Sequence, residues 1–126
     1  MTDTRYQLRV DVQSVYLPEQ SRPDDAHYAF AYTIRITNTG NVAAQLISRH
    51  WTIRDEAGRV IEVNGLGVVG KQPLLEPGAR FEYTSGSQIA TPDGAMHGSY
   101  FFVAEDGHRF EVPIEEFALS MPRTLH

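Results

Sequence analysis

The segment from His27 to Thr37, HYAFAYTIRIT, alternates large apolar residues with small or polar ones over its whole length. An apolar residue at every second position is the pattern of a β-strand with one buried face. The segment is therefore the candidate central strand of an antiparallel sheet. Its buried face is expected to carry Tyr28, Phe30, Tyr32, Ile34 and Ile36.

The same period continues on both sides of this segment. From Tyr6 to Gln13 apolar and polar residues again alternate, which predicts a half-buried strand. After the central segment, Asn38-Thr39-Gly40-Asn41 supplies residues that tolerate positive φ, so residues 42–55 are expected to return as the second strand of a hairpin. The connection 17–25 contains two prolines and is expected to be exposed.

Four more short runs of β-branched and aromatic residues follow, separated by turn signals. No stripe of apolar residues with a helical period competes with them; the nearest is Ile114 to Leu119, which is too short. The pattern predicts an all-β domain over residues 1–126, with seven or eight strands in a two-sheet antiparallel β-sandwich of the immunoglobulin or fibronectin type III kind. The four runs are Arg59 to Val63, Arg80 to Gln88, Met96 to Ala104 and His108 to Ile114.

Composition narrows the classes of function. The chain has 126 residues and no cysteine, so a thiolate nucleophile, a disulfide framework and a cysteine-based metal site are excluded. A net charge of −5 argues against nucleic acid as a partner, because binding it needs a basic patch. No apolar run approaches the length of a membrane span or of a signal peptide core. A cytoplasmic protein without direct membrane insertion is expected.

The stretch most suggestive of chemistry is NGLGVVGKQP, residues 64–73. It contains G-x-G-x-x-G at Gly65, Gly67 and Gly70, and an overlapping G-x-x-x-x-G-K that ends at Lys71. Both patterns bind phosphate only where a helix follows, and two nearby prolines prevent a helix here. The glycines are better explained by tight turns of the backbone against the sandwich. Backbone N–H groups beside Lys71 leave weak anion binding as the alternative.

Five motifs are spread over nearly the whole chain: FAYTI at 30–34, LISRHW at 46–51, GLGVVG at 65–70, FEYTSG at 81–86 and the closing Leu125-His126. In their order and spacing these motifs resemble the ApaG family. The resemblance implies a fibronectin-like β-sandwich with no established enzymatic activity and no cofactor. It also implies a link to cobalt resistance and magnesium efflux, and a role as a protein-interaction module. Lys71 departs from the family, in which an acidic residue is common at that position.

The remaining candidate residues are basic. Trp51 is expected to anchor the core, with Arg49 on the same face of its strand and His50 on the other. Arg49, His50 and Arg80, with Lys71, are a possible partner surface. The histidines lack the spacing of metal ligands, so no metal site is expected. The alternative is that His97 and His108 meet across the hairpin 96–114 and bind a divalent ion weakly.

Two hypotheses follow from the sequence. The first is a non-catalytic binding module that acts through protein–protein interaction, at an exposed sheet edge or at the loop from Gly65 to Leu75. The second is a sensor that binds a nucleotide polyphosphate or a divalent cation at Gly65, Gly67, Gly70 and Lys71. A protein partner of unknown identity is expected in the first case. A homodimer through paired edge strands is possible.

Overall fold

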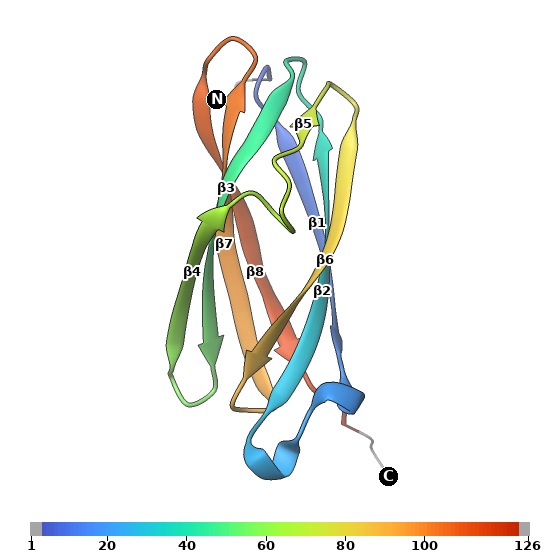
Figure 1. Cartoon of the computed structure of the whole chain (residues 1–126), viewed down its shortest axis with the longest axis vertical. Helices are drawn as coiled ribbons and strands as arrows, with labels where there is room; N and C mark the ends of the chain where they lie inside the picture. Colours follow the sequence, from blue (N-terminus) through green and yellow to red (C-terminus); the bar gives the residue numbers. More distant parts are fainter. Residues whose placement is uncertain (1–3, 124–126) are drawn as a thin grey trace.

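The alternating segments form eight strands in the computed structural model, which describes residues 4–123 (Figure 1). Two packed antiparallel sheets confirm the predicted all-β sandwich. The only helical segments among the described residues are the turns η1 (Pro18–Gln20) and η2 (Pro23–Asp25), so no helix there could span a membrane. The strands are β1 (Leu8–Tyr16), β2 (Tyr28–Asn38), β3 (Ala44–Asp55), β4 (Val60–Leu66), β5 (Leu74–Leu75), β6 (Arg80–Ile89), β7 (Asp93–Ala104) and β8 (Arg109–Ser120).

Strand order differs from the expected hairpin after the central strand. The central strand β2 lies between β1 and β6, whereas β3 lies in the other sheet, in the order β4-β3-β7-β8 with β5 also paired to β3. The hairpin prediction is therefore wrong, because the chain crosses between the sheets after β2. Buried Asn38 holds this crossing: its Nδ2 donates to the carbonyls of Val42 and Leu75, at 3.0 and 2.9 Å. Its Oδ1 accepts from the N–H of Gly40.

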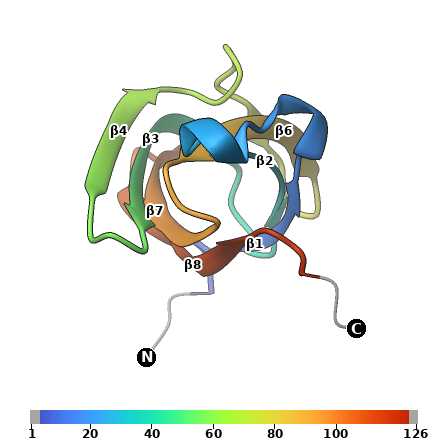
Figure 2. The same cartoon turned by 90° about the horizontal axis from the view of Figure 1, so that it is seen from below.

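The two long sides of the sandwich differ. On one side β1 and β8 lie together, and the Ser14 hydroxyl of β1 donates to the carbonyl of Ala118 in β8, at 2.8 Å. On the other side β4 and β6 are the edge strands of their sheets, and the loop after β4 projects outward between them (Figure 2). We call this second side the open side.

Trp51 organises the core, as the sequence predicts. The ring is 2% exposed and packs edge-on against Tyr32, Tyr100 and Phe117, with centroids 5.3 to 6.4 Å apart. Gly98 lies opposite Trp51 on β7, where an added Cβ would be 2.1 Å from the carbonyl oxygen of His50 and 3.1 Å from the Trp51 ring. The expected apolar face of β2 is also inside, since Phe30, Tyr32, Ile34 and Ile36 are buried and Tyr28 is half-buried.

Three stretches differ from the expected elements. Residues 114–119 are strand within β8, because they pair with β7. Residues 64–66, expected as loop, extend β4 because they pair with β3 as far as Ser48. The two-residue strand β5 follows Pro73 and was not expected. The closing motif Leu125-His126 lies outside the described residues.

Candidate functional site: the open side of the sandwich

Arg49 holds the glycine loop from inside the sandwich. It pairs in register with Tyr100 of β7 and Gly65 of β4, so its side chain lies on the inner face of the sheet. Its Nη1 donates to the carbonyl oxygens of Leu66 and Gly67, at 3.1 and 2.8 Å. An added Cβ at Gly65 would meet the guanidinium at 2.7 Å. The first glycine of the motif therefore makes room for this arginine.

The other two glycines build a tight turn at residues 68–71, which we call the spur. The N–H of Val68 donates to the carbonyl of Lys71 at 2.8 Å, and the N–H of Lys71 donates back at 2.9 Å. Gly67 has φ +64°, and a Cβ atom added to it would lie only 2.3 Å from the carbonyl oxygen of Lys71. Gly70 has φ +78°. The G-x-G-x-x-G pattern is thus explained by backbone conformation and close packing.

The hydrogen bonds of the loop also bear on anion binding. A phosphate nest needs several neighbouring N–H groups that point at the ligand. Here the N–H groups of Val68 and Lys71 bond to each other's carbonyls, and that of Gly67 donates to the carbonyl of Ile47 at 2.8 Å. Nη1 of Arg49 likewise donates to carbonyl oxygens. These groups are not free to surround an anion in this conformation.

Val69, at the tip of the spur, has a strained backbone. Its φ is +43°, a region that a β-branched residue rarely adopts, and the Gly70 that follows is also positive. Two consecutive positive φ angles are what a type I′ turn requires, and Asn-Gly is the sequence that it favours. Val69 is 53% exposed, so core packing does not compensate for the strain. An exposed apolar residue in a strained conformation points to a role at the surface.

We expect Val69→Asn to raise the free energy of unfolding by about 1 kcal/mol, because asparagine tolerates the left-handed conformation and creates the favoured Asn-Gly pair. Urea unfolding followed by circular dichroism measures the change. Val69→Ile is the matched control: it keeps the β-branch, so its stability should equal that of the unchanged protein. A Val69→Asn protein that is no more stable than this control would contradict the assigned strain.

Exposed apolar residues gather on the open side. Seven large hydrophobic side chains are exposed among the described residues, and six of them lie on β4, the spur or β5. Since single exposed hydrophobics are ordinary, it is the clustering that indicates a contact surface. The seventh is Val15 on β1, which makes it a natural control. The six are Val60, Ile61, Val63, Leu66, Val69 and Leu74.

A groove runs beside this surface, between β3 and β4 of one sheet and β6 of the other. It consists of two adjoining hollows of about 250 and 430 Å³ that share Ile53, Ile61 and Gln88 as lining residues. Ser87 of β6 lines the larger hollow; it is 9% exposed, and its buried hydroxyl has no hydrogen-bond partner among the described residues. A buried hydroxyl without a partner is costly, so the groove is suited to a ligand that supplies one.

The hydroxyls of Tyr83 and Tyr100 link the two sheets behind the spur. Tyr83 lies in β6 and Tyr100 in β7, and their buried hydroxyl groups share a hydrogen bond. Burial raises the pKa of both tyrosines well above the ordinary value, and nearby Arg49 only partly opposes this. Both hydroxyls therefore stay neutral at physiological pH, and the pair acts as a structural link.

The basic residues expected to form one patch lie on different surfaces. Arg49 is on the inner face of the five-stranded sheet, whereas His50 is on its outer face, with Nε2 3.8 Å from Glu62. Arg80 begins β6 in the other sheet, and Lys71 closes the spur. The structure does not bring these four side chains together.

The two histidines left open by the sequence are also apart. His108 lies opposite Ala104 at the turn of the β7–β8 hairpin and stacks on Tyr6, with ring centroids 4.0 Å apart. His97 is seven residues back along β7, or about 23 Å at the usual rise per residue. No group of three or more His, Asp or Glu side chains suited to a metal ion occurs within residues 4–123.

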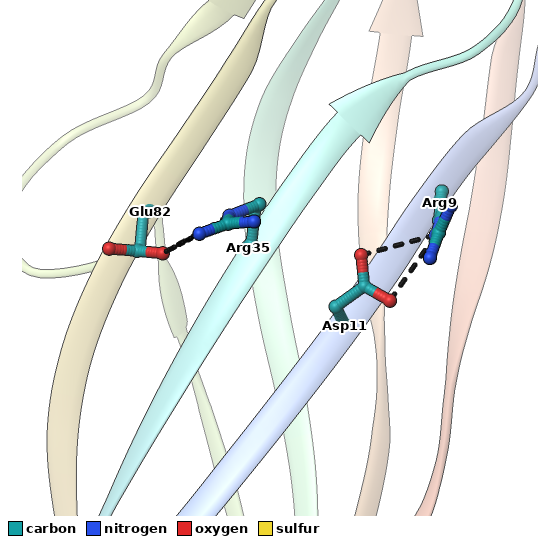
Figure 3. Close-up of polar contacts among 4 residues, drawn as sticks. All are labelled: Arg9, Asp11, Arg35 and Glu82. Carbon is teal, nitrogen blue, oxygen red and sulfur yellow. Dashed lines mark hydrogen bonds and ion pairs between the residues drawn. The ribbon is translucent and has the colours of Figure 1, made fainter.

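The outer face of the three-stranded sheet contrasts with the open side. It carries charged residues paired with one another: Arg9 Nε lies 3.2 Å from Asp11, and Arg35 Nη2 lies 3.0 Å from Glu82 (Figure 3). Charges that are exposed and already paired contribute little to stability and offer no apolar contact.

These features define a small antiparallel β-sandwich of the fibronectin type III kind, with a glycine-built spur and an apolar edge strand, β4, whose outer side is unpaired within residues 4–123. The ApaG domain model matches residues 18–104, and the chain belongs to the ApaG family. It is 65% identical to the protein ApaG of Ralstonia nicotianae over 123 residues, 98% of this chain and 99% of that one. ApaG of Nitrosospira multiformis is 62% identical, covering 97% and 96%.

Solved structures agree with this assignment. A crystal structure of a Bordetella pertussis protein titled ApaA superposes with a TM-score of 0.93 at 60% identity, covering 96% of this chain and 98% of that one. A second structural genomics target superposes at 0.88 with 45% identity, covering 94% and 90%. The family predicted from the five motifs is confirmed.

Proposed function

We propose that this protein is a non-catalytic protein-binding module whose open side takes up an extended segment of a partner protein. The observation that supports this most is the row of exposed apolar residues on β4, the spur and β5, beside an edge strand with one free side. Extended peptides commonly bind by adding a strand to such an edge, with main-chain hydrogen bonds for affinity and side-chain pockets for specificity.

The register of β4 indicates what the partner segment looks like. Ile61 and Val63 pair with Ile53 and Trp51 on the inner face, so alternate partner residues that face the groove should be apolar. One of them should also carry a hydrogen-bonding group for the Ser87 hydroxyl. On the outer face Glu62 favours a basic residue opposite it.

The proposal also includes the cellular process that the binding serves. In keeping with what the family resemblance implies, we assign the binding to cobalt resistance and magnesium efflux, through contact with a transporter or its regulator in the cytoplasm. The rival function, a sensor of a nucleotide polyphosphate or a divalent cation at the glycine loop, has less support. Three N–H groups of that loop already donate to carbonyl oxygens of the protein, those of Gly67, Val68 and Lys71.

Site-specific photo-crosslinking in living cells tests the proposal. A photoreactive phenylalanine is placed at position 63, 66 or 69, and at position 15 as the control, since Val15 is also an exposed apolar residue but lies on β1. We expect adducts with a different protein from the first three positions only. Mass spectrometry then maps the partner segment, and a synthetic peptide of that segment should bind the unchanged protein and Val15→Lys but not Val63→Lys.

Two results would refute the proposal. One is a set of adducts that contains only copies of this chain, or none at all, at the three open-side positions. The other is a mapped peptide that binds Val63→Lys as tightly as the unchanged protein, which would place the contact outside β4.

A further inference from the structure

The free edge of β4 lacks the features that usually keep edge strands from pairing. Its sequence, VIEVNGL, has no proline or lysine and a single charge, Glu62. No strand within residues 4–123 pairs with the side that faces away from β3. At the other edge of the same sheet, β8 carries Pro113 and lies beside β1. The β4 edge is thus open to strand addition.

The seven residues of β4 are complementary to a second copy of themselves. One antiparallel register pairs all seven, and in it Val63 faces Val63 of the second copy across a two-fold axis. On the same inner face Ile61 then lies over Gly65, where there is no side chain to clash. On the outer face Val60 meets Leu66, both of which are more than half exposed in the single chain.

Charge supports the same register. Glu62 falls opposite Asn64, which can donate to its carboxylate, so no like charges lie directly opposite each other. The arrangement is isologous, because each copy offers the same surface to the other. It also brings the spur end of each β4 alongside the groove end of the other, since Gly65 of one copy lies opposite Ile61 of the second.

We infer that the isolated protein forms a homodimer by antiparallel pairing of β4 with β4 of a second copy. This inference rests on the proposed use of the β4 edge for strand addition and names the partner that occupies it first. The dimer covers the apolar edge, and a partner's strand has to displace the second copy in order to bind. Dimerisation and partner binding are therefore mutually exclusive.

The symmetry of the Val63 pair provides a stringent test. Val63→Lys and Val63→Glu each place like charges opposite each other in the dimer, whereas an equal mixture of the two variants places opposite charges there. Sedimentation velocity from micromolar to near-millimolar concentration should show a monomer–dimer equilibrium for the unchanged protein. Each variant alone should dimerise at least about tenfold more weakly. The mixture should regain the dimer, and Val15→Lys should match the unchanged protein.

Recovery in the mixture also excludes misfolding of the variants as the cause of their weaker association. The inference is overturned if the unchanged protein stays monomeric at every concentration, or if Val63→Lys dimerises as tightly as the unchanged protein. It is overturned as well if the mixture of the two variants does not form the dimer. It is also overturned if Val15→Lys loses the dimer too. None of these results decides the proposed function, because the crosslinking experiment reads adducts with a different protein.

Discussion

Replacing Trp51 with alanine is expected to lower the free energy of unfolding by about 3–5 kcal/mol, the usual loss for removing a large buried aromatic side chain. The ring is 2% exposed and touches three other aromatic rings, so its removal leaves a cavity between the two sheets. Since small domains are stable by only about 5–15 kcal/mol, the variant should be marginally folded at best. Urea unfolding followed by far-UV circular dichroism measures the loss, because no tryptophan remains for fluorescence.

Trp51→Phe is the control for this prediction. Phenylalanine retains part of the ring contacts, so its loss of stability should be clearly smaller than that of alanine. A Trp51→Ala protein that loses less than about 1 kcal/mol, the ordinary effect of a point mutation, would contradict the central role given to this residue.

Replacing Arg49 with methionine should loosen the spur while the sandwich stays folded. Methionine keeps much of the length of the side chain but leaves the carbonyl oxygens of Leu66 and Gly67 without their donor. Hydrogen bonds from a charged group contribute about 1.5–3 kcal/mol. A local loss of about 2 kcal/mol corresponds to roughly thirtyfold faster amide exchange. The exchange rates of Gly67, Val68 and Lys71, measured by NMR, test this prediction.

Arg35→Met is the matched control, since Arg35 also makes a polar contact but lies on the exposed outer face with Glu82 (Figure 3). An exposed ion pair of this kind contributes less than about 1 kcal/mol, and its loss should leave exchange in the spur unchanged. Equal exchange rates in the Arg49→Met and Arg35→Met proteins would show that Arg49 does not hold the loop.

Much of the fold could be predicted from the sequence because apolar and polar residues alternate along a half-buried strand. The period of two in residues 28–36 identified the face of β2 that is buried, and Trp51 was correctly expected in the core. Sheet membership was harder. The turn residues after β2 were read as a hairpin, whereas the side chain of Asn38 bonds to carbonyls near β3 and β5 and holds a crossing between the sheets. A hydrogen bond from Asn38 to a residue as distant in sequence as Leu75 leaves no local pattern from which it could be predicted.

The site was predicted only in part. The loop from Gly65 to Leu75 was singled out as a binding element, and three of the six exposed apolar residues lie within it, namely Leu66, Val69 and Leu74. The sequence did not predict that Arg49 holds the glycine loop. The contact between its guanidinium and the loop carbonyls depends on how β4 pairs with β3. Tight turns were correctly expected in the glycine loop, but the turn could not be placed at Val69-Gly70, since this pair lacks the Asn or Asp that usually marks such a turn.

The groove and Ser87 could not be predicted from the sequence. Ser87 is one of several hydroxyl residues on β6, and only the packed sheets show that its hydroxyl is buried without a partner. Likewise, the free edge of β4 follows from the order of the strands in the sheet. The alternation of apolar and polar residues does not reveal that order.

The central claim is that the β4 edge is the binding surface, and amide hydrogen exchange of the protein with and without the crosslinked partner peptide tests it most directly. With the protein dilute enough to be monomeric, the account predicts that protection appears in residues 60–66 and the spur, where an added strand would supply new hydrogen bonds. Residues 8–16 of β1, which carries the control Val15, should exchange as before. Protection on β1 or β8, or none on β4 at saturating peptide, would contradict the claim.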